Sequence, residues 1–264
     1  MKASIILPTY NRGVKLAQAV ESIQNSNFPK KDFEIIIIND NSEDNTEIIV
    51  KTLKKKYKNI NYIKNEKNLG PASSRNVGIK LAKGKYIFFT DDDCIVPDNW
   101  IKKYVEFFGK NKDVGGIGGL LEPAEKNVIS KIELLKDKIL KIKSNKMIIG
   151  KEEVPVGFTN NMSYRKEVFS KIGFFNEKFK APAGEDSEFK KRVAKKFKLA
   201  FIPIKVIHNH NYNLDYLLSI LYRQGLEKNP PKNKFMKLII LIFKSPVWIY
   251  NILKKTFMYR RYKR

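Results

Sequence analysis

Apolar and polar residues alternate in blocks along the first 110 positions of the chain. Short apolar runs, rich in β-branched residues, alternate with longer amphipathic segments whose apolar residues recur at helical spacing. Strands are expected at residues 3–7, 33–38, 60–63 and 86–89, and helices at residues 14–23, 43–57 and 71–82. Strands that alternate with helices of this length predict an α/β fold, with a mainly parallel sheet flanked by helices.

The pattern is less regular from residue 111 onward. The expected elements are strand-like segments at 114–121, 153–164, 199–202 and 206–207, and helices at 128–142, 184–197 and 214–226. A further helix is expected to begin near Trp100. No internal repeat or low-complexity linker divides this region. We therefore expect one large domain at residues 1–228, with halves at about 1–110 and 111–228, followed by a tail at residues 229–264.

The tail differs in composition from the rest of the chain. No acidic residue follows Glu227, and apolar runs at 238–243 and 247–253 alternate with lysines. Each run is too short to cross a bilayer, and a Lys-Ser-Pro sequence separates them. Basic residues beside aliphatic and aromatic ones predict a helical appendage that lies in an anionic membrane interface. A terminal helix packed on the core or on a second subunit is the alternative.

The charge balance is strongly positive. The chain has 52 basic and 27 acidic residues, for a net charge of +25, which favours phosphate-rich or anionic partners. The lysines are spread over helices, and no basic arm or zinc-ligand spacing indicates nucleic acid.

The chain has a single cysteine, Cys94, and so cannot form an internal disulfide, which fits a reducing compartment. We expect Cys94 to be a small residue of the core. The amino terminus lacks the apolar stretch of a signal peptide, so we expect a cytoplasmic protein.

Carboxylates follow the predicted strands at one edge of the sheet. Asp91, Asp92 and Asp93 come directly after the strand at 86–89, and Asp40 follows the strand at 33–38. Open α/β sheets bind ligands at the carboxyl ends of their strands. Three adjacent carboxylates repel one another, and a divalent cation with a preference for oxygen ligands relieves that repulsion. A polar turn before the next helix is the alternative interpretation.

Four segments, in this order, resemble the family 2 glycosyltransferases with the GT-A fold. They are ILPTYNR (6–12), IINDNS (37–42), NLGPASSRNVG (68–78) and TDDD (90–93). The resemblance extends over about residues 1–225. It implies a Rossmann-like GT-A domain and an inverting, metal-dependent transfer of a sugar from a nucleotide diphosphate donor, with a UDP-sugar favoured, to an acceptor hydroxyl.

The resemblance also implies roles for individual residues on the donor side. Asp40 can accept a hydrogen bond from a base N–H, although Asn39 stands where many members have a second Asp. The start of the helix at Pro71 offers free N–H groups to an anion. The residues assigned to the nucleotide-sugar are Pro8, Thr9, Tyr10, Arg12, Asp40, Asn68, Gly70, Arg75, Asp91 and Asp92.

Further roles concern the metal and the acceptor. Asp93, Asp91 and His208 are the implied ligands of Mn²⁺ or Mg²⁺, and His210 is left open in place of His208. The sequence Gly-Glu-Asp at 184–186 resembles the acceptor-side motif of the family. It implies that Asp186 is the general base and that Glu185 orients the acceptor. An acidic first turn of a helix gives the same letters.

With the basic apolar tail, the expected acceptor is a lipid-linked or cell-surface glycan intermediate at the inner face of the membrane. Two other functions are alternatives. A nucleotidyltransferase acting on sugar phosphates would carry a glycine-rich loop after the first strand, where this chain has Gly13 alone. A non-catalytic basic module that binds membrane or nucleic acid would explain the charge. It would leave the ordered carboxylates Asp40, Asp91–Asp93 and Asp186 without a role.

Overall fold

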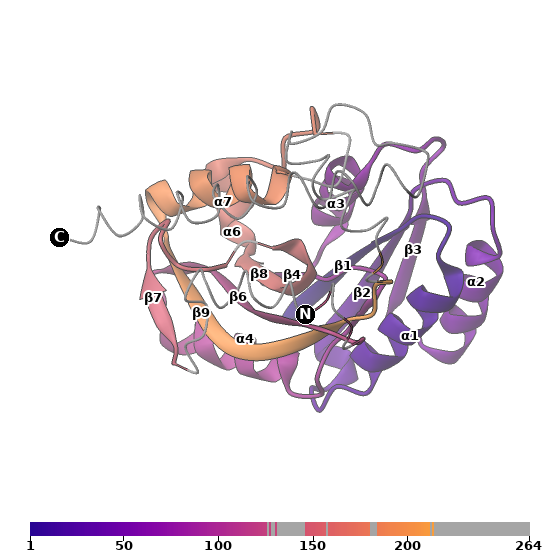
Figure 1. The fold of residues 1–264 in the computed structure, drawn as a ribbon, viewed down its shortest axis with the longest axis horizontal. Coiled ribbons are helices and arrows are strands. Elements are labelled where there is room, and N and C mark those ends of the chain that lie inside the picture. The colour runs from indigo at the N-terminus through magenta and orange to yellow at the C-terminus, as the bar shows by residue number, and fades with distance from the viewer. Residues whose placement is uncertain are drawn as a thin grey trace. The chain divides into compact units, whose positions relative to one another are not determined.

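Four parallel strands form the first half of the sheet in a computed structural model of the chain (Figure 1). The structure describes residues 1–125, 127, 130, 146–156, 158–179, 184–211 and 213. The strands are β1 (Ala3–Thr9), β2 (Phe33–Asn39), β3 (Ile60–Lys64) and β4 (Tyr86–Phe89), in the spatial order β3-β2-β1-β4. They are joined by α1 (Gly13–Gln24), α2 (Thr46–Lys56) and α3 (Pro71–Leu81). Every residue of β2 is buried, as a strand covered on both faces requires.

The second half of the sheet is antiparallel. β8 (Met162–Arg165) pairs with β4, and β6 (Val114–Pro123) pairs with β8. β5 (Cys94–Ile95) and β7 (Ile148–Gly150) both pair with β9 (Lys198–His208), which Figure 1 shows as a long curved strand. Within the described residues the order is β3-β2-β1-β4-β8-β6-β9-β5, with β7 beside β9. The sheet is therefore curled and mixed, and its parallel half confirms the predicted α/β architecture.

Helices cover both faces of the sheet. Alternate residues of β1 point to opposite faces and therefore pack against different helices. Ile5 and Leu7 belong to the apolar core beneath α1, α2 and α4 (Trp100–Lys110). On the other face, a Cβ added to Gly78 of α3 would lie 2.6 Å from Cγ2 of Ile6, so the helix packs closely against β1 at this glycine. α6 (Lys166–Ile172) and α7 (Glu185–Lys196) lie on the same side as α3 (Figure 1).

A buried asparagine joins the two halves of the domain beside β6. Asn161 ends the short 3₁₀ helix η2 (Thr159–Asn161), and its Oδ1 accepts hydrogen bonds from Trp100 Nε1 at 3.0 Å and the Tyr104 hydroxyl at 2.9 Å. Its Nδ2 donates to the carbonyls of Leu120 at 2.8 Å and Ile204 at 3.0 Å. One amide thus satisfies polar groups of α4, β6 and β9, which would otherwise be buried without partners.

The expected elements of the first half are confirmed, including the strand at 86–89 with its bounds. The helix expected at 43–57 begins later, at Thr46, because the Asp44 side chain accepts hydrogen bonds from the backbone N–H groups of Thr46 and Gly13. β9 is one strand where two were expected. β5, β7, α6 and the 3₁₀ helix η1 (Lys30–Asp32) were not expected, since elements this short give no periodic pattern.

Contacts divide the chain into one unit of residues 1–122 with 145–209 and another of residues 123–144 with 210–264. The helices expected at 214–226 and in the tail lie outside the described residues, and of the helix expected at 128–142 only residue 130 is described. In the part of the chain that the structure describes, no helix is long and apolar enough to cross a membrane. The predicted domain bounds stay a prediction.

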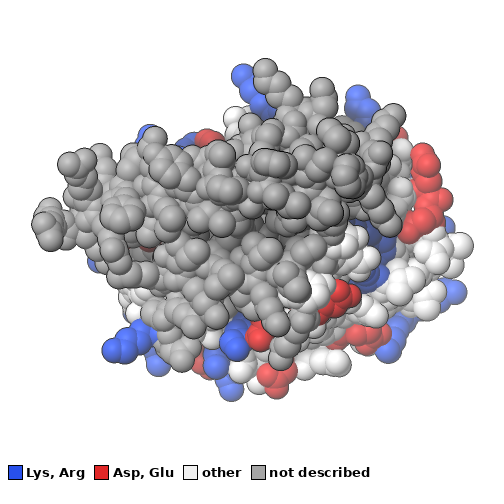
Figure 2. All heavy atoms as spheres, viewed as in Figure 1, with Lys and Arg blue, Asp and Glu red and all other residues white. Residues whose placement is uncertain are grey.

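Charged side chains of both signs lie interspersed on the visible part of the described surface (Figure 2). Glu47, for example, pairs with Lys51 at 2.8 Å and with Lys64 at 3.0 Å. Exposed pairs of this kind contribute little to stability, because solvent screens them. They fit the expected set of solvated lysine-rich faces.

Candidate active site

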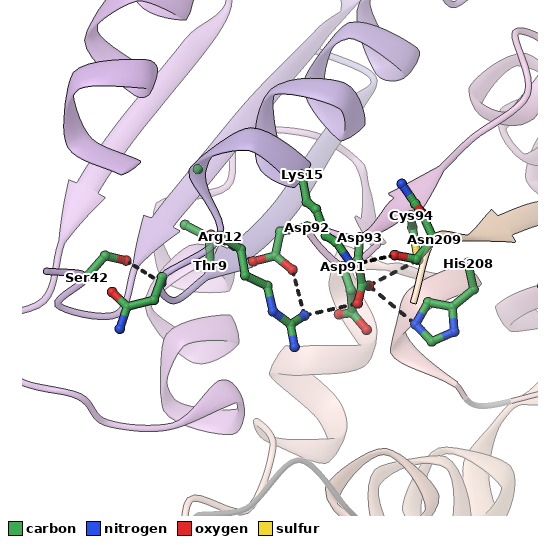
Figure 3. Close-up of polar contacts among 12 residues, drawn as sticks. Thr9, Arg12, Lys15, Ser42, Asp91, Asp92, Asp93, Cys94, His208 and Asn209 are labelled. Carbon is green, nitrogen blue, oxygen red and sulfur yellow. Dashed lines mark hydrogen bonds and ion pairs between the residues drawn. The ribbon is translucent and has the colours of Figure 1, made fainter. Parts of the chain in front are cut away.

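The three consecutive carboxylates lie at the carboxyl end of β4, as predicted, but their surroundings differ. The side chain of Asp91 is 28% exposed, whereas those of Asp92 and Asp93 are 6% and 3% exposed. Thr9 Oγ1 donates a 2.8 Å hydrogen bond to Asp92 Oδ2. Arg12 Nη1 lies 3.1 Å from Asp92 Oδ1 and 3.0 Å from Asp93 Oδ2 (Figure 3). Two buried carboxylates therefore share one guanidinium.

Burial dominates the electrostatics of this pair. It raises the pKa of Asp92 to about 6, although Arg12 and the Thr9 hydroxyl both favour the ionised form. The neighbouring charges of Asp93 and Asp91 act in the same direction as burial. The site thus concentrates negative charge that it only partly neutralises, which is the condition under which a carboxylate cluster attracts a cation.

Asp93 and His208 meet across the pairing of β5 with β9. Cys94, the next residue after Asp93, lies opposite His208 in the register. His208 Nε2 is 3.3 Å from Asp93 Oδ1, so the nitrogen and the oxygen that could ligate a metal already face each other. The backbone N–H of Asn209 donates to the Asp93 carbonyl at 2.7 Å, and Lys15 Nζ donates to the Asn209 carbonyl at 2.7 Å. These bonds hold the end of β9 against the carboxylates (Figure 3).

The donor set of Asp93 and His208 fits a divalent metal. A carboxylate oxygen and an imidazole nitrogen together suit Mn²⁺ and related ions. Asp91 is placed differently, because its Oδ1 accepts a hydrogen bond from Arg75. Burial raises the pKa of the Cys94 thiol, which keeps the thiol protonated. This agrees with the interpretation of Cys94 as a core residue.

Asp40 anchors the loop that leads into α3. Its Oδ1 accepts hydrogen bonds from Asn65 Nδ2 at 2.7 Å and from the N–H of Leu69 at 2.9 Å, and its Oδ2 accepts one from the N–H of Gly70 at 2.8 Å. Gly70 precedes α3 with φ of 84°, a conformation that disfavours residues with a Cβ. A carboxylate has about four acceptor positions, so Asp40 retains capacity for a hydrogen bond from a ligand.

The loops after β1 and β2 brace each other. Asn11 and Asn41 adopt φ of 52° and 67°. The N–H of Asn11 donates to Ser42 Oγ at 2.9 Å, and the N–H of Glu43 donates to Asn11 Oδ1 at 2.8 Å. Asn39 supports the same turn, since its Oδ1 accepts a hydrogen bond from the N–H of Ser42. This structural use of the amide explains why an asparagine is acceptable at position 39.

The remaining predicted donor-side residues lie around these loops without a described side-chain hydrogen bond. Pro8 is in β1 opposite Ile38 of β2, and the Tyr10 side chain is 45% exposed beside the braced turn. Asn68 is exposed in the loop that Asp40 anchors. Tyr10 and Asn68 are therefore both accessible to solvent.

Arg75 connects the β4 loop to the start of α7. Its Nη1 donates to Glu185 Oε1 at 2.8 Å and its Nη2 donates to Asp91 Oδ1 at 3.0 Å. Arg75 and Glu185 are 4% and 3% exposed. Arg75 Nε and Glu185 Oε2 are buried and have no hydrogen-bond partner among the described residues. The sequence predicted a function for each of these residues but not the ion pairs that join them.

Asp186 follows Glu185 in the first turn of α7. Burial, and next the charge of Glu185, raise its pKa to about 6, while the N–H of Ser187 and the charge of Arg75 oppose the shift. The carboxylate is therefore ionised at neutral pH and still basic enough to take a proton. This is the property expected of a general base.

Asn76 has a structural role that the sequence does not reveal. Its Nδ2 donates to the Phe175 carbonyl at 2.9 Å and to Glu177 Oε1 at 2.8 Å, and its Oδ1 accepts a hydrogen bond from the N–H of Phe175 at 3.0 Å. Asn76 thus holds the segment after α6 against α3. Because its partners lie 99 and 101 residues away, no local pattern could have indicated them.

Comparisons with known proteins identify the family of this chain. The model of the family described as "Glycosyl transferase family 2" matches residues 4–173. Poly(ribitol-phosphate) beta-glucosyltransferase of Bacillus spizizenii is 36% identical over 121 residues, which are 46% of this chain and 19% of the relative. GalNAc(5)-diNAcBac-PP-undecaprenol beta-1,3-glucosyltransferase of Campylobacter jejuni is 44% identical over 93 residues, or 35% of this chain and 29% of the relative. The chain thus spans less than a third of the length of either relative.

Two solved structures share the fold. S. aureus TarS 1–349 in complex with UDP-GlcNAc has a TM-score of 0.60 and 20% identity, covering 90% of this chain and 69% of that one. Mannosyltransferase PcManGT of Pyrobaculum calidifontis in complex with GDP-Man and Mn²⁺ has a TM-score of 0.64 and 15% identity, covering 97% and 73%.

Proposed function

Because the chain belongs to glycosyl transferase family 2, we propose that it is an inverting, metal-dependent glycosyltransferase. It would move a sugar from a nucleotide diphosphate donor to an acceptor hydroxyl. The observation that carries the proposal is the connected set of Asp91, Arg75 and Glu185, which joins the carboxylate loop to the helix that bears Asp186. The likeness to solved glycosyltransferase structures agrees with the expected GT-A fold.

The proposed donor is a UDP-sugar. The complex of TarS with UDP-GlcNAc supports UDP, and the complex of the mannosyltransferase with GDP-Man shows that the fold also accepts a GDP-sugar. Tyr10 and Asn68 are exposed, and in this proposal a base stacks on the Tyr10 ring and donates an N–H to the Asp40 carboxylate. Arg75 and Asp91 would lie on the ribose and diphosphate side.

Asp93 and His208 are the residues that would hold Mn²⁺ or Mg²⁺, with Asp91 nearby on the same loop. The Mn²⁺ in the mannosyltransferase complex supports this cofactor for the fold. A metal at this position supplies a Lewis acid that stabilises the charge on the departing diphosphate.

The chain's own residues would direct the chemistry at the acceptor. Asp186 takes the proton of the acceptor hydroxyl as that oxygen bonds to the anomeric carbon. The bond from this carbon to the diphosphate breaks on the opposite face, and the electron pair leaves with the nucleotide diphosphate. Glu185 and Arg75 act as positioning residues, because their buried ion pair fixes the first turn of α7 relative to Asp91.

The proposed acceptor is a lipid-linked or cell-surface glycan intermediate, taken up at the cytoplasmic face of the membrane. The names of the two relatives, for poly(ribitol-phosphate) and for an undecaprenol-linked glycan, support this class. Residues 229–264, with their basic and apolar composition, would attach the enzyme to anionic lipid. Deletion from Phe235 onward should release the protein from membranes without loss of UDP binding. Unchanged sedimentation with membranes would refute this role of the tail.

Release of UDP from UDP-sugars in the presence of Mn²⁺ tests the proposed activity. Asp93→Ala should abolish it, because the substitution removes a proposed metal ligand. Asp98→Ala is a matched control, since Asp98 is exposed on the same stretch of chain and lies outside the carboxylate cluster. A wild-type protein that neither binds nucleotide-sugars nor releases the nucleoside diphosphate would refute the proposed function.

A further inference from the structure

Arg12 covers the two buried carboxylates of the β4 loop. One nitrogen, Nη1, lies within 3.1 Å of both Asp92 and Asp93. The carboxylate side chains are 6% and 3% exposed, but the Arg12 side chain is 43% exposed. Figure 3 shows the guanidinium between the two acids. The cation is therefore the outer, solvent-facing member of the cluster.

The same contact involves the proposed metal ligand. Asp93 presents Oδ2 to Arg12 and Oδ1 to His208. A divalent cation bound to this carboxylate would stand next to a guanidinium of the same sign, and the two charges would repel each other. Arg12 and the metal would therefore compete for Asp93 unless the guanidinium moves away.

The structure allows the side chain of Arg12 to move while its backbone stays in place. The preceding residue, Asn11, is fixed by hydrogen bonds with Ser42 and Glu43. After it, the Arg12 carbonyl accepts the first hydrogen bond of α1, from the N–H of Leu16 at 2.9 Å. A change of partner by the guanidinium needs only side-chain rotation. An arginine released from carboxylates is well suited to phosphate, because its donors match that geometry.

We propose that Arg12 exchanges partners during donor binding. In the free enzyme it pairs with Asp92 and Asp93, and in the donor complex it pairs with the diphosphate and leaves Asp93 to the metal. This rests on the proposed function. The exchange makes the metal and the nucleotide bind cooperatively, because each removes an obstacle for the other.

The exchange predicts effects of opposite sign for one substitution. In Arg12→Ala, Mn²⁺ alone should bind about tenfold tighter than in the wild type, because its competitor is gone. At saturating Mn²⁺, UDP should bind about tenfold more weakly, because a phosphate partner is gone. A factor of ten corresponds to about 1.4 kcal/mol, near the lower end for a hydrogen bond to a charged group.

The experiment measures free Mn²⁺ by electron paramagnetic resonance and UDP binding by calorimetry, both with the full chain. Lys54→Ala is the control for net charge, since Lys54 is exposed on α2, and it should change neither affinity. Arg12→Lys keeps a cation and should lie between the wild type and Arg12→Ala. It also serves as the test variant if Arg12→Ala does not fold.

Weaker or unchanged Mn²⁺ binding in the Arg12 variants would overturn the proposal, because Arg12 would then not compete with the metal. Unchanged UDP binding with tighter Mn²⁺ binding would also overturn it, because Arg12 would not pass to the diphosphate. Failure of the proposed function is a separate result, in which the wild-type protein itself binds no UDP at any Mn²⁺ concentration.

Discussion

Replacement of Arg75 by methionine would leave two carboxylates without the cation that they share. Arg75 donates to Glu185 at 2.8 Å and to Asp91 at 3.0 Å, and the side chains of Arg75 and Glu185 are 5% and 4% exposed. Glu185 Oε2 already has no partner among the described residues. The variant would therefore bury an uncompensated charge. Breaking a buried ion pair from one side lowers the free energy of unfolding by about 3–5 kcal/mol.

Urea unfolding followed by circular dichroism measures this loss, and thermal unfolding gives a second reading. For a chain of about this size, 1 kcal/mol shifts the melting temperature by roughly 2–4 °C. We therefore expect the melting temperature of Arg75→Met to fall by about 6–20 °C. Lys56→Met is the matched control, because it breaks an ion pair with Glu21 whose side chains are 59% and 39% exposed. The melting temperature of that variant should stay close to that of the wild type, because solvent screens an exposed pair.

A double variant distinguishes the buried charge from loss of packing. The double variant Arg75→Met with Glu185→Leu removes both members of the buried ion pair. Replacing such a pair by apolar residues often leaves stability unchanged or raises it. The double variant should therefore regain most of the free energy of unfolding that Arg75→Met loses. If the double variant is as unstable as Arg75→Met, or if Arg75→Met unfolds within 1 kcal/mol of the wild type, the buried ion pair is not what stabilises this region.

Three further outcomes follow from single contacts. In urea unfolding, Gly78→Ala should lose about 1–3 kcal/mol by overpacking, since its Cβ would lie 2.6 Å from Ile6. Gly109→Ala in α4 is the control and should not be destabilised, because nothing lies within 4 Å of its Cβ. Because the pKa of Asp186 is about 6 and its ionised form is the base, kcat/KM should fall about tenfold per pH unit below pH 6, and a flat profile from pH 5 to 8 would contradict that role. Asn161→Leu should lose at least about 3 kcal/mol in the same unfolding assay, because it leaves two side-chain donors and two carbonyls unpaired.

The apolar pattern of the sequence predicts where the carboxylates lie, because they come directly after the predicted strands. Asp40 and the triplet at 91–93 follow apolar runs whose length and β-branching identify buried strands, and parallel strands end at a common edge. The resemblance to the family added the residues of α3 and α7. These parts of the site were predictable because the relevant information lies within ten or so consecutive residues.

The contacts between segments were not predictable in the same way. The ion pair of Arg75 with Glu185 joins residues 110 positions apart, and Asn161 bonds to residues 41 to 61 positions away. A buried polar pair depends on the relative placement of two elements, which apolar periodicity does not encode. His208 reaches Asp93 through the two-residue strand β5, an element too short to leave any pattern.

Asp40 limits how the nucleotide preference of this enzyme can change. As the proposed contact to the base, it is the obvious position to vary for a different nucleobase. The same carboxylate also accepts the hydrogen bonds from Asn65, Leu69 and Gly70 that set the start of α3. A substitution there would alter the proposed base contact and also displace the start of α3. New base preferences are therefore more accessible through exposed neighbours such as Tyr10, in evolution as in protein engineering.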